Sequence, residues 1–249
     1  MNVTILRHDT LDSTNTEAAN QARMGADEGV CVVARQQTAG RGRHGRVWVS
    51  EKDSGLYFSI VLRPEIDPRH LPLITLMTGI AVYDALKEFD LRPDIKWVND
   101  VLIGEKKICG ILAETVDTTR GLAVIVGIGI NLTDRNFPDE IADTATSIKT
   151  ETGEVVNGGD LAAALTPYLC YFYDILNGAD GAIEIVREWQ RRSSYFSGKS
   201  VRATLANETF EGVTDGIEEN GALRVKRSDG SITIVQAGEI ERLRLAVSE

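Results

Sequence analysis

The sequence predicts an α/β protein of the α+β type, in which helices flank a mixed central β-sheet and a small β-barrel follows. Residues 121–132 are almost continuously apolar (G-L-A-V-I-V-G-I-G-I-N-L), which is typical of a central strand buried on both faces. Residues 68–90 repeat apolar side chains every three or four positions, which indicates an amphipathic helix packed on that sheet. Beyond residue 197, apolar and polar residues alternate between Asn-Gly and Asp-Gly turns, so four or five short strands of a small barrel are expected.

Composition limits the class of protein. The 249 residues are 43% hydrophobic, which is enough to bury the core of one large domain or of a large and a small one. With 37 acidic and 27 basic residues the net charge is −10, which argues against a general DNA-binding protein. No signal peptide or membrane-spanning run is visible, and Cys31, Cys109 and Cys170 lie in apolar runs without metal-ligand spacing. We therefore expect a cytoplasmic protein with buried, reduced thiols that binds neither DNA nor membranes.

A short strand over residues 3–7 is expected to lead into a helix. Ser13, Thr14 and Asn15 are all N-cap residue types, and Glu17 stands three positions after Thr14, which is the spacing of a capping box. Hydroxyl and amide groups at the start of a helix can also bind a polar ligand. Capping and ligand binding are compatible, so both hypotheses stand.

The next feature is a basic, glycine-rich stretch over residues 35–48, R-Q-Q-T-A-G-R-G-R-H-G-R-V-W, which holds four arginines and no acid. Guanidinium groups suit the binding of phosphate or carboxylate oxygens, and three glycines make ordering costly. We expect this stretch to be a flexible anion-binding loop that orders over its ligand, and we call its second part, residues 40–48, the Arg loop. A solvated linker or an RNA-binding tail is the alternative. Apolar strands predicted over residues 29–35 and 55–62 flank the stretch, which favours a functional loop.

The loop also contains the spacing G-x-G-x-x-G, which is typical of dinucleotide-binding proteins. That interpretation requires a helix directly after the third glycine. The sequence instead leads into another strand, so we reject it.

Polar residues recur between residues 94 and 132. Asn99 and Asp100 in D-I-K-W-V-N-D-V-L could form a plain turn, or could hold Mg²⁺ or a phosphate-linked ribose. Lys107 begins a strand over residues 106–114 and could be a solvated strand end, unless it acts together with the Arg loop. Asn131 ends the central strand and is a candidate polar contact, while the glycines of that strand suggest the close approach of a ligand or backbone. Residues 134–159 read as loop, in which 145–147 could line a pocket; helices are predicted over 160–176 and 179–192.

Taken in order, G-R-G-R-H-G-R-x-W, K-W-V-N-D, K-K-I-C-G-I-L-A-E and G-I-G-I-N-L resemble the catalytic domain of the biotin protein ligase family, the biotin–[acetyl-CoA-carboxylase] ligases. The S-T-N after the first strand fits the same family. The resemblance implies a catalytic domain over residues 1–195 and an SH3-like barrel over 196–249. Val98 stands where the family usually has proline, and His44 where many members carry arginine. Because the first catalytic strand begins at Val3, we expect a monofunctional form without the DNA-binding winged helix of some members.

This resemblance implies ATP-dependent biotinylation of one lysine on a biotin carboxyl carrier domain, through biotinoyl-5′-AMP and with release of pyrophosphate. Adenylation brings an anionic carboxylate against an anionic phosphate, so preorganised cations must offset the repulsion. We choose Arg41, Arg43 and Lys107 as catalytic groups, with Mg²⁺ at Asp100. Closure of the loop would exclude water from the adenylate.

Binding residues follow from the same resemblance. The contacts expected for biotin are Ser13, Thr14, Asn15, Gln37, Arg41, Gly42, Arg43, Lys107 and Gly110. The contacts expected for ATP and the adenylate are Arg43, Arg46, Trp48, Asn99, Lys107 and Asn131. Since some members dimerise through sheet edges, a homodimer is also considered.

Two alternatives stay open. A lipoate or octanoate ligase or transferase would share the fold, although the G-R-G-R-H-G and K-W-x-N-D motifs are on the biotin side. A non-catalytic nucleic-acid or nucleotide-binding module would use the Arg loop for salt-sensitive binding without ATP turnover. The acidic net charge argues against this second alternative.

Overall fold

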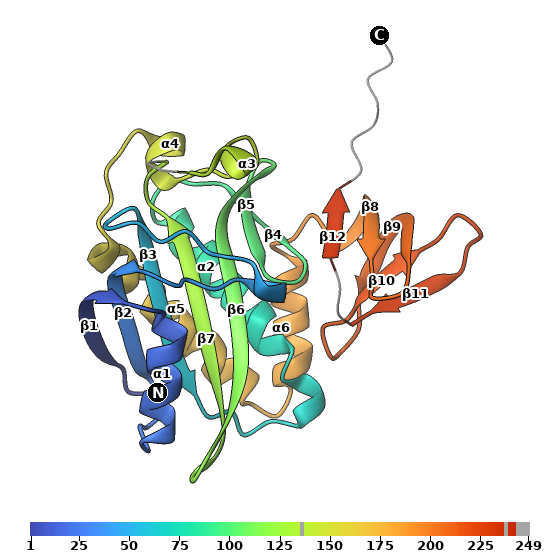
Figure 1. Cartoon of the computed structure of the whole chain (residues 1–249). Helices are drawn as coiled ribbons and strands as arrows, with labels where there is room; N and C mark the ends of the chain where they lie inside the picture. Colours follow the sequence, from blue (N-terminus) through green and yellow to red (C-terminus); the bar gives the residue numbers. More distant parts are fainter. Residues whose placement is uncertain (135–136, 237–238, 243–249) are drawn as a thin grey trace.

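The computed structural model describes residues 1–134, 137–236 and 239–242. Its main sheet has seven strands in the order β1-β2-β3-β7-β6-β5-β4 (Figure 1). Strands β1 and β2 are parallel, and all other neighbours in this sheet are antiparallel. The predicted mixed sheet is therefore confirmed, with β7 at its centre. The strands are β1 Thr4–Leu11, β2 Val30–Gln37, β3 Gly55–Leu62, β4 Pro93–Lys96, β5 Asp100–Ile103, β6 Lys106–Thr118 and β7 Gly121–Asn131.

Three helices cover one face of this sheet, and a single helix lies on the other (Figure 1). The covering helices are α2 Leu73–Lys87, α5 Gly158–Leu176 and α6 Gly181–Gln190, while α1 Thr14–Arg23 packs on the opposite face. The helix predicted over residues 68–90 is shorter than expected, because Pro68–His70 form a separate 3₁₀ turn before Pro72, which sets the start of α2. Helix α2 is buried almost all round, since the sheet lies on one side of it and α5 and α6 on the other.

On the sheet face that carries α1, part of strands β6 and β7 is not covered by the helix and is lined by glycine residues. Successive side chains of a strand point to opposite faces, so Gly110, Leu112 and Glu114 of β6 share this face with their cross-strand partners on β7. Two of those partners are Gly127 and Gly129. Glycine adds no side chain, so a hollow remains here; we call Gly110, Gly127 and Gly129 the glycine floor.

Two predicted segments differ in detail from the structure. The run over residues 94–102 is a hairpin of β4 and β5, in which Lys96 pairs with Asp100 and residues 97–99 form the turn. The segment over residues 134–159, expected to be rich in loops, contains two short helices, α3 Asp139–Ala142 and α4 Ile148–Thr152, that were not predicted individually. Such short helices lack the apolar periodicity that predicts helix from sequence.

The carboxy-terminal part is an antiparallel sheet of five strands in the order β11-β10-β9-β8-β12, beside β4 and α6 (Figure 1). The strands are β8 Ser197–Thr204, β9 Thr209–Ile217, β10 Leu223–Lys226, β11 Ile232–Val235 and β12 Glu239–Arg242. Gly221 and Gly230 lie in the two predicted turns with φ of 84° and 86°, which confirms the turn chemistry. One apolar core runs through both parts of the chain, so the division between residues 195 and 196 stays a proposal.

One buried ion cluster holds the helical layer together. The Arg192 guanidinium bonds Asp84 at 2.8 Å and also bonds Glu188, and it stacks near the rings of Phe172 and Tyr83. All three charged side chains are less than a fifth exposed, so the cluster is largely shielded from solvent. We call it the Arg192 cluster.

Among the described helices, none is long and apolar enough to cross a bilayer.

The three cysteines are free thiols, as expected. Cys31 and Cys109 are buried and Cys170 is partly buried. Burial raises the pKa of the Cys31 thiol to about 12 and raises that of Cys109 further, so both stay protonated at neutral pH.

Candidate active site

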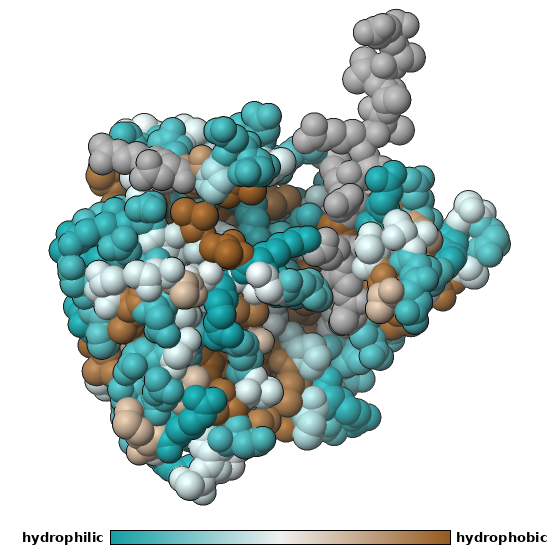
Figure 2. All heavy atoms as spheres, in the orientation of Figure 1, coloured by the Kyte–Doolittle hydropathy of each residue, from teal (hydrophilic) through white to brown (hydrophobic). Residues whose placement is uncertain are grey.

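A cavity of about 760 Å³ lies above the glycine floor, between the start of α1, the Arg loop and the β5–β6 hairpin. Its size suits a small-molecule ligand. The face on which it opens mixes hydrophobic patches with hydrophilic side chains (Figure 2). Every predicted binding, catalytic and metal residue lines this one cavity: Ser13, Thr14, Asn15, Gln37, Arg41, Gly42, Arg43, Arg46, Trp48, Asn99, Asp100, Lys107, Gly110 and Asn131. The structure therefore brings the predicted residues together, while their individual roles stay predictions.

The start of α1 is closed by Gln37 and lacks the expected capping box. Ser13 is the N-cap residue but makes no side-chain capping bond, and the Glu17 carboxylate accepts a bond from Gln21 instead. The backbone N–H of Thr14 donates to Oε1 of Gln37 at 2.8 Å, as does its hydroxyl at 3.1 Å. The capping-box prediction is therefore wrong, because a side chain from β2 occupies the place of the local cap. The helix start is thereby tied to the sheet.

Asn15 is held from several sides at once. Its Oδ1 accepts from the Ser59 hydroxyl at 2.6 Å, and its Nδ2 donates to the Glu114 carboxylate at 2.8 Å and to the Leu112 carbonyl at 3.3 Å. A Cβ placed on Gly127 would come within 2.2 Å of Asn15 Oδ1, so this amide lies directly on the glycine floor. Asn15 thus braces one end of the cavity.

The Arg loop is a small hairpin in this structure. Arg41 and Val47 form an isolated antiparallel bridge, the N–H of Gly42 donates to the Arg46 carbonyl at 2.7 Å, and that of Trp48 donates to the Gly40 carbonyl at 2.9 Å. The tip turns at His44, which has a φ of 56°. The expectation that this loop is disordered without ligand stays a prediction.

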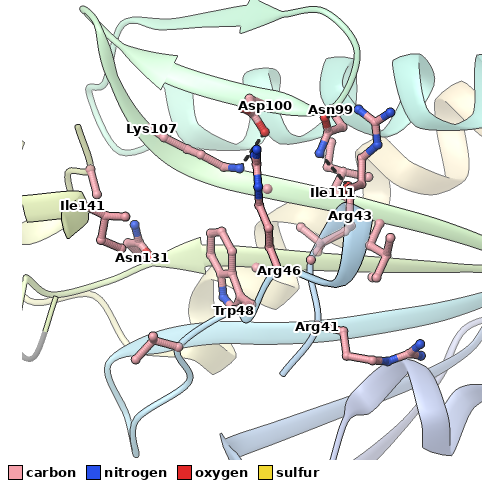
Figure 3. A pocket seen from close by; sticks show the side chains of 18 of the residues that line it. Arg41, Arg43, Arg46, Trp48, Asn99, Asp100, Lys107, Ile111, Asn131 and Ile141 are labelled. Carbon is pink, nitrogen blue, oxygen red and sulfur yellow. Dashed lines mark hydrogen bonds and ion pairs between the residues drawn. The ribbon is translucent and has the colours of Figure 1, made fainter. Parts of the chain in front are cut away.

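The arginines of the stretch point to different partners. Both Nη atoms of Arg41 bond the Glu114 carboxylate at 2.9 Å, and Nη1 of Arg43 donates to Asn99 Oδ1 at 3.0 Å. Arg46 points from the loop into the cavity on the side of Lys107 (Figure 3). Arg35 lies outside the cavity and bonds Asp53 at 2.6 Å, so it belongs to the surface.

Lys107 and Trp48 meet over the glycine floor. The Lys107 ammonium lies 2.6 Å from Asp100 Oδ1 and 5.5 Å from the centre of the Trp48 ring (Figure 3). A Cβ on Gly129 would come within 2.5 Å of that ring, and one on Gly110 within 2.9 Å, so the indole lies against the floor. An aromatic face beside a cation offers a surface for a flat, anionic ligand such as a nucleotide.

The described residues contain no preformed metal site. In the parts of the chain that the structure describes, no three His, Cys, Asp or Glu side chains are grouped to hold an ion. Asp100, the predicted Mg²⁺ ligand, already forms an ion pair with the Lys107 ammonium at 2.6 Å.

Several lining or bracing residues were missed from sequence. Ser59 places a hydroxyl group inside the apolar run of β3, and Glu114 places a carboxylate inside a mostly apolar strand. A polar side chain within an apolar strand is a sequence signal by which both residues could have been predicted to belong to the site. Ile240 and Tyr195 reach the cavity from distant sequence, which no local pattern indicates. Burial, with the nearby carboxylates of Asp94 and Asp100, raises the pKa of Tyr195 to about 12.

The segment after β7 contributes less than expected. Ala145 lines the cavity as predicted, because residues 144–146 run parallel to Lys107 with backbone bonds of 2.7 and 2.9 Å. Thr146 and Ser147 are buried instead of lining it. The Thr146 carbonyl accepts from Asn131 Nδ2 at 2.9 Å, so part of that amide holds the segment in place.

Two protein-family models match this chain. The model of the biotin/lipoate A/B protein ligase family matches residues 8–131, and that of the biotin protein ligase C-terminal domain matches residues 196–243.

Individual proteins show the same similarity. The bifunctional ligase/repressor BirA of Bacillus subtilis is 36% identical over 244 residues, which are 95% of this chain and 73% of that protein. A biotin–[acetyl-CoA-carboxylase] ligase of Paracoccus denitrificans is 33% identical over an aligned region of 236 residues, which is 92% of this chain and 96% of that protein. The solved structure of a biotin protein ligase from Aquifex aeolicus in complex with biotin and ATP superposes with a TM-score of 0.84 at 29% identity, over 97% and 99% of the two chains.

Proposed function

The chain belongs to the biotin protein ligase family, and from that premise we propose that it joins biotin to one lysine of a biotin carboxyl carrier domain. The reaction uses ATP, proceeds through biotinoyl-5′-AMP and releases pyrophosphate. One observation supports this most directly: cations of the Arg loop and of β6 converge on a single cavity above an uncharged glycine floor. Relatives named for acetyl-CoA carboxylase make the carrier domain of that enzyme the expected acceptor.

The first step joins two anions. The biotin carboxylate attacks the α-phosphorus of ATP, the bond from that phosphorus to the bridging oxygen breaks, and pyrophosphate leaves. Arg43 and Lys107 offset the repulsion and stabilise the charge that develops on the phosphate oxygens. Asn99 holds the Arg43 guanidinium in place at 3.0 Å, and Asp100 holds the Lys107 ammonium at 2.6 Å. Arg43 is therefore oriented before substrate arrives, which reduces the cost of reorganisation in the transition state, whereas Lys107 exchanges Asp100 for the substrate anions.

Arg41 is the third predicted catalytic group. Both of its terminal nitrogens bond Glu114. A direct role in adenylation would require it to leave that carboxylate. We therefore propose that Arg41 contributes mainly by positioning the Arg loop.

We assign the ureido ring of biotin to one end of the cavity and the adenylate to the other. Ser13, Thr14 and Asn15 are 3–4% exposed and meet the ureido ring of biotin, with Gln37 fixing the helix start behind them. The adenylate lies toward Trp48, Arg46 and Asn131, where the indole offers a stacking surface. Gly42 and Gly110 allow close approach of the ligand between these ends.

Mg²⁺ enters as part of the ATP substrate. ATP sites commonly hold the ion through one or two carboxylates together with phosphate oxygens, so a single Asp100 is a sufficient protein contribution. Asp100 can serve once Lys107 turns to the substrate anions. The ion would add positive charge near the phosphates.

Transfer follows activation. The acceptor lysine attacks the carbonyl carbon of the adenylate, the bond to AMP breaks and an amide forms. Until then the Arg loop, which carries Val47 at the cavity, and Val49 directly after it limit the access of water to the mixed anhydride. A homodimer stays a prediction that sedimentation would test.

Biotin-dependent exchange of labelled pyrophosphate into ATP tests the proposal. Wild type should exchange only with biotin, and Arg43→Ala and Lys107→Ala should each lose about 100-fold in rate. Arg202→Ala is the matched control, because it removes a cation of the carboxy-terminal sheet that bonds Glu211 outside the cavity. Exchange with lipoate or octanoate but not biotin would replace the substrate. Salt-sensitive binding of nucleic acid without any exchange would overturn the enzymatic function.

A further inference from the structure

Glu114 of β6 is the meeting point of the sheet, the start of α1 and the Arg loop. Its Oε1 accepts from Nη1 of Arg41 and its Oε2 accepts from Nη2, both at 2.9 Å. The same Oε2 accepts from Nδ2 of Asn15 at 2.8 Å. One carboxylate therefore satisfies donors from two different segments that border the cavity.

The Glu114 carboxylate is held by a rigid part of the fold. Glu114 belongs to β6, which pairs with β7 along most of its length near the centre of the sheet. Asn15, on its other side, is fixed by Ser59 and lies within 2.2 Å of the Cβ position of Gly127, so it has little room to shift. The Arg loop is the movable partner in this arrangement, because it is joined to the sheet only at its two ends and through side-chain contacts such as this one.

The geometry suits a clamp on the loop. A bidentate pair between a guanidinium and a carboxylate fixes orientation as well as distance. Arg41 begins the hairpin that ends near Trp48, and its backbone bridges to Val47 on the returning strand. Holding Arg41 therefore holds both arms of the hairpin over the cavity.

We propose that Glu114 is a positioning residue that keeps the Arg loop closed over the cavity by clamping Arg41. This inference rests on the proposed function only for its effect on activity, since the clamp itself is a property of the fold. The Arg41 side chain is 48% exposed and that of Glu114 33%, so solvent screens the pair and the loop still opens.

The expected kinetic signature follows from population shift. When the closed fraction falls, the apparent affinity for a ligand held by the closed loop falls by the same factor. Saturating ligand restores closure, so the maximal rate recovers. In Glu114→Gln, loss of the clamp should raise the KM for biotin by about threefold to fivefold and leave kcat nearly unchanged; for Arg41→Gln, which alters a predicted catalytic group, only the KM and the loop cleavage rate are compared. A general folding defect would instead lower kcat through loss of active enzyme.

Glu114→Gln is the main variant. Glutamine keeps an oxygen for Asn15 but removes the charge that holds Arg41. Arg41→Gln breaks the same contact from the exposed side, which guards against a folding defect at Glu114. Glu211→Gln is the matched control, because it breaks an Arg–Glu pair of the same 2.9 Å length, with Arg202 in the carboxy-terminal sheet.

Two measurements are made on the intact chain. Trypsin cleavage after Arg43 and Arg46, followed by mass spectrometry, reports opening of the loop and needs no activity. Cleavage should be about threefold to fivefold faster in Glu114→Gln and Arg41→Gln than in wild type or Glu211→Gln. Pyrophosphate exchange gives KM and kcat for biotin in the same four proteins and in the double variant Arg41→Gln/Glu114→Gln, which should be no worse than either single variant.

The outcomes are separable. Wild-type cleavage in Glu114→Gln would overturn the clamp, and so would single-variant effects on the KM that multiply in the double variant. A fall in kcat without a rise in KM would also overturn it. If the wild-type protein exchanges no acid at all, the proposed function fails, while the cleavage rates still decide whether Glu114 closes the loop.

Discussion

Replacing Gly129 by alanine tests whether the glycine floor exists to seat Trp48. Gly129 lies near the end of β7, and its backbone φ is outside the left-handed region, so the obstacle to alanine is space. The new methyl carbon would stand 2.5 Å from Cε2 and Nε1 of Trp48. Carbon atoms pack at about 3.5 Å. The indole, which is mounted on the Arg loop, must therefore retreat by roughly 1 Å.

The size of the effect follows from that displacement. A shift of roughly 1 Å in a positioning group can cost on the order of 100-fold in rate. Exchange of a strand glycine for alanine itself favours folding by about 0.5–1 kcal/mol, which offsets part of the lost packing. We expect kcat/KM for biotin in pyrophosphate exchange to fall by on the order of 100-fold, with little change in the midpoint of thermal unfolding. Trp48 emission should also change, whereas Trp97, which lines the same cavity, and Trp189 are both buried and should contribute little to the change.

Gly158→Ala is the matched control. This glycine begins α5, and a Cβ there would meet nothing closer than 3.8 Å, which is ordinary contact. It should leave both exchange and tryptophan emission unchanged. Wild-type exchange together with unchanged emission in Gly129→Ala would refute the seating of Trp48 on the floor.

Three further predictions concern stability and motion. Arg192→Ala leaves Asp84 without its Arg192 partner in a largely shielded position, while Glu188 keeps its ion pair with Arg191, so it should lower the free energy of unfolding by about 3 kcal/mol, whereas Arg202→Ala should change it little; equal thermal shifts for the two would contradict this. Burial raises the pKa values of Cys31 and Tyr195 to about 12. Their neutral forms therefore contribute stability that is complete below the lower pKa values of the unfolded chain and is lost as pH rises toward 12. The free energy of unfolding in urea should decline above about pH 9, and a rise of that free energy would contradict this. Backbone amides of residues 41–46 should exchange hydrogen rapidly without ligand, because a screened ion pair holds the loop weakly, and slowly with biotin and ATP; uniform protection in the ligand-free protein would contradict this.

Periodicity and turn chemistry made most of the fold predictable. The continuous apolar run of β7 identified the central strand, because a strand covered on both faces needs no polar alternation. Glycine at positions that require positive φ identified the hairpins of the carboxy-terminal sheet. The short helices α3 and α4 and the exact start of α2 were not predictable, since they depend on prolines and on contacts between distant segments.

The site was predictable as a set of residues but not as a set of contacts. Motif resemblance named fourteen positions that the fold gathers around one cavity. The partners of these side chains come from strands far away in sequence: Gln37 closes the start of α1, and Glu114 receives Arg41. Pairing across a sheet depends on register, which no local pattern of the arginine-rich stretch encodes.

The balance of charge in the cavity explains why an acidic chain can host this chemistry. Lys107 bonds Asp100 and Arg41 bonds Glu114, so acids of the sheet hold two of the site's cations in fixed directions before any ligand enters. A substrate carboxylate or phosphate that takes the place of Asp100 at Lys107 exchanges one anion for another, and the number of ion pairs is conserved. The glycine floor brings no charge of its own and lets Asn15, Trp48 and Lys107 pack directly against the sheet. We propose that these cations above an uncharged floor supply the electrostatic environment for adenylation of a carboxylate.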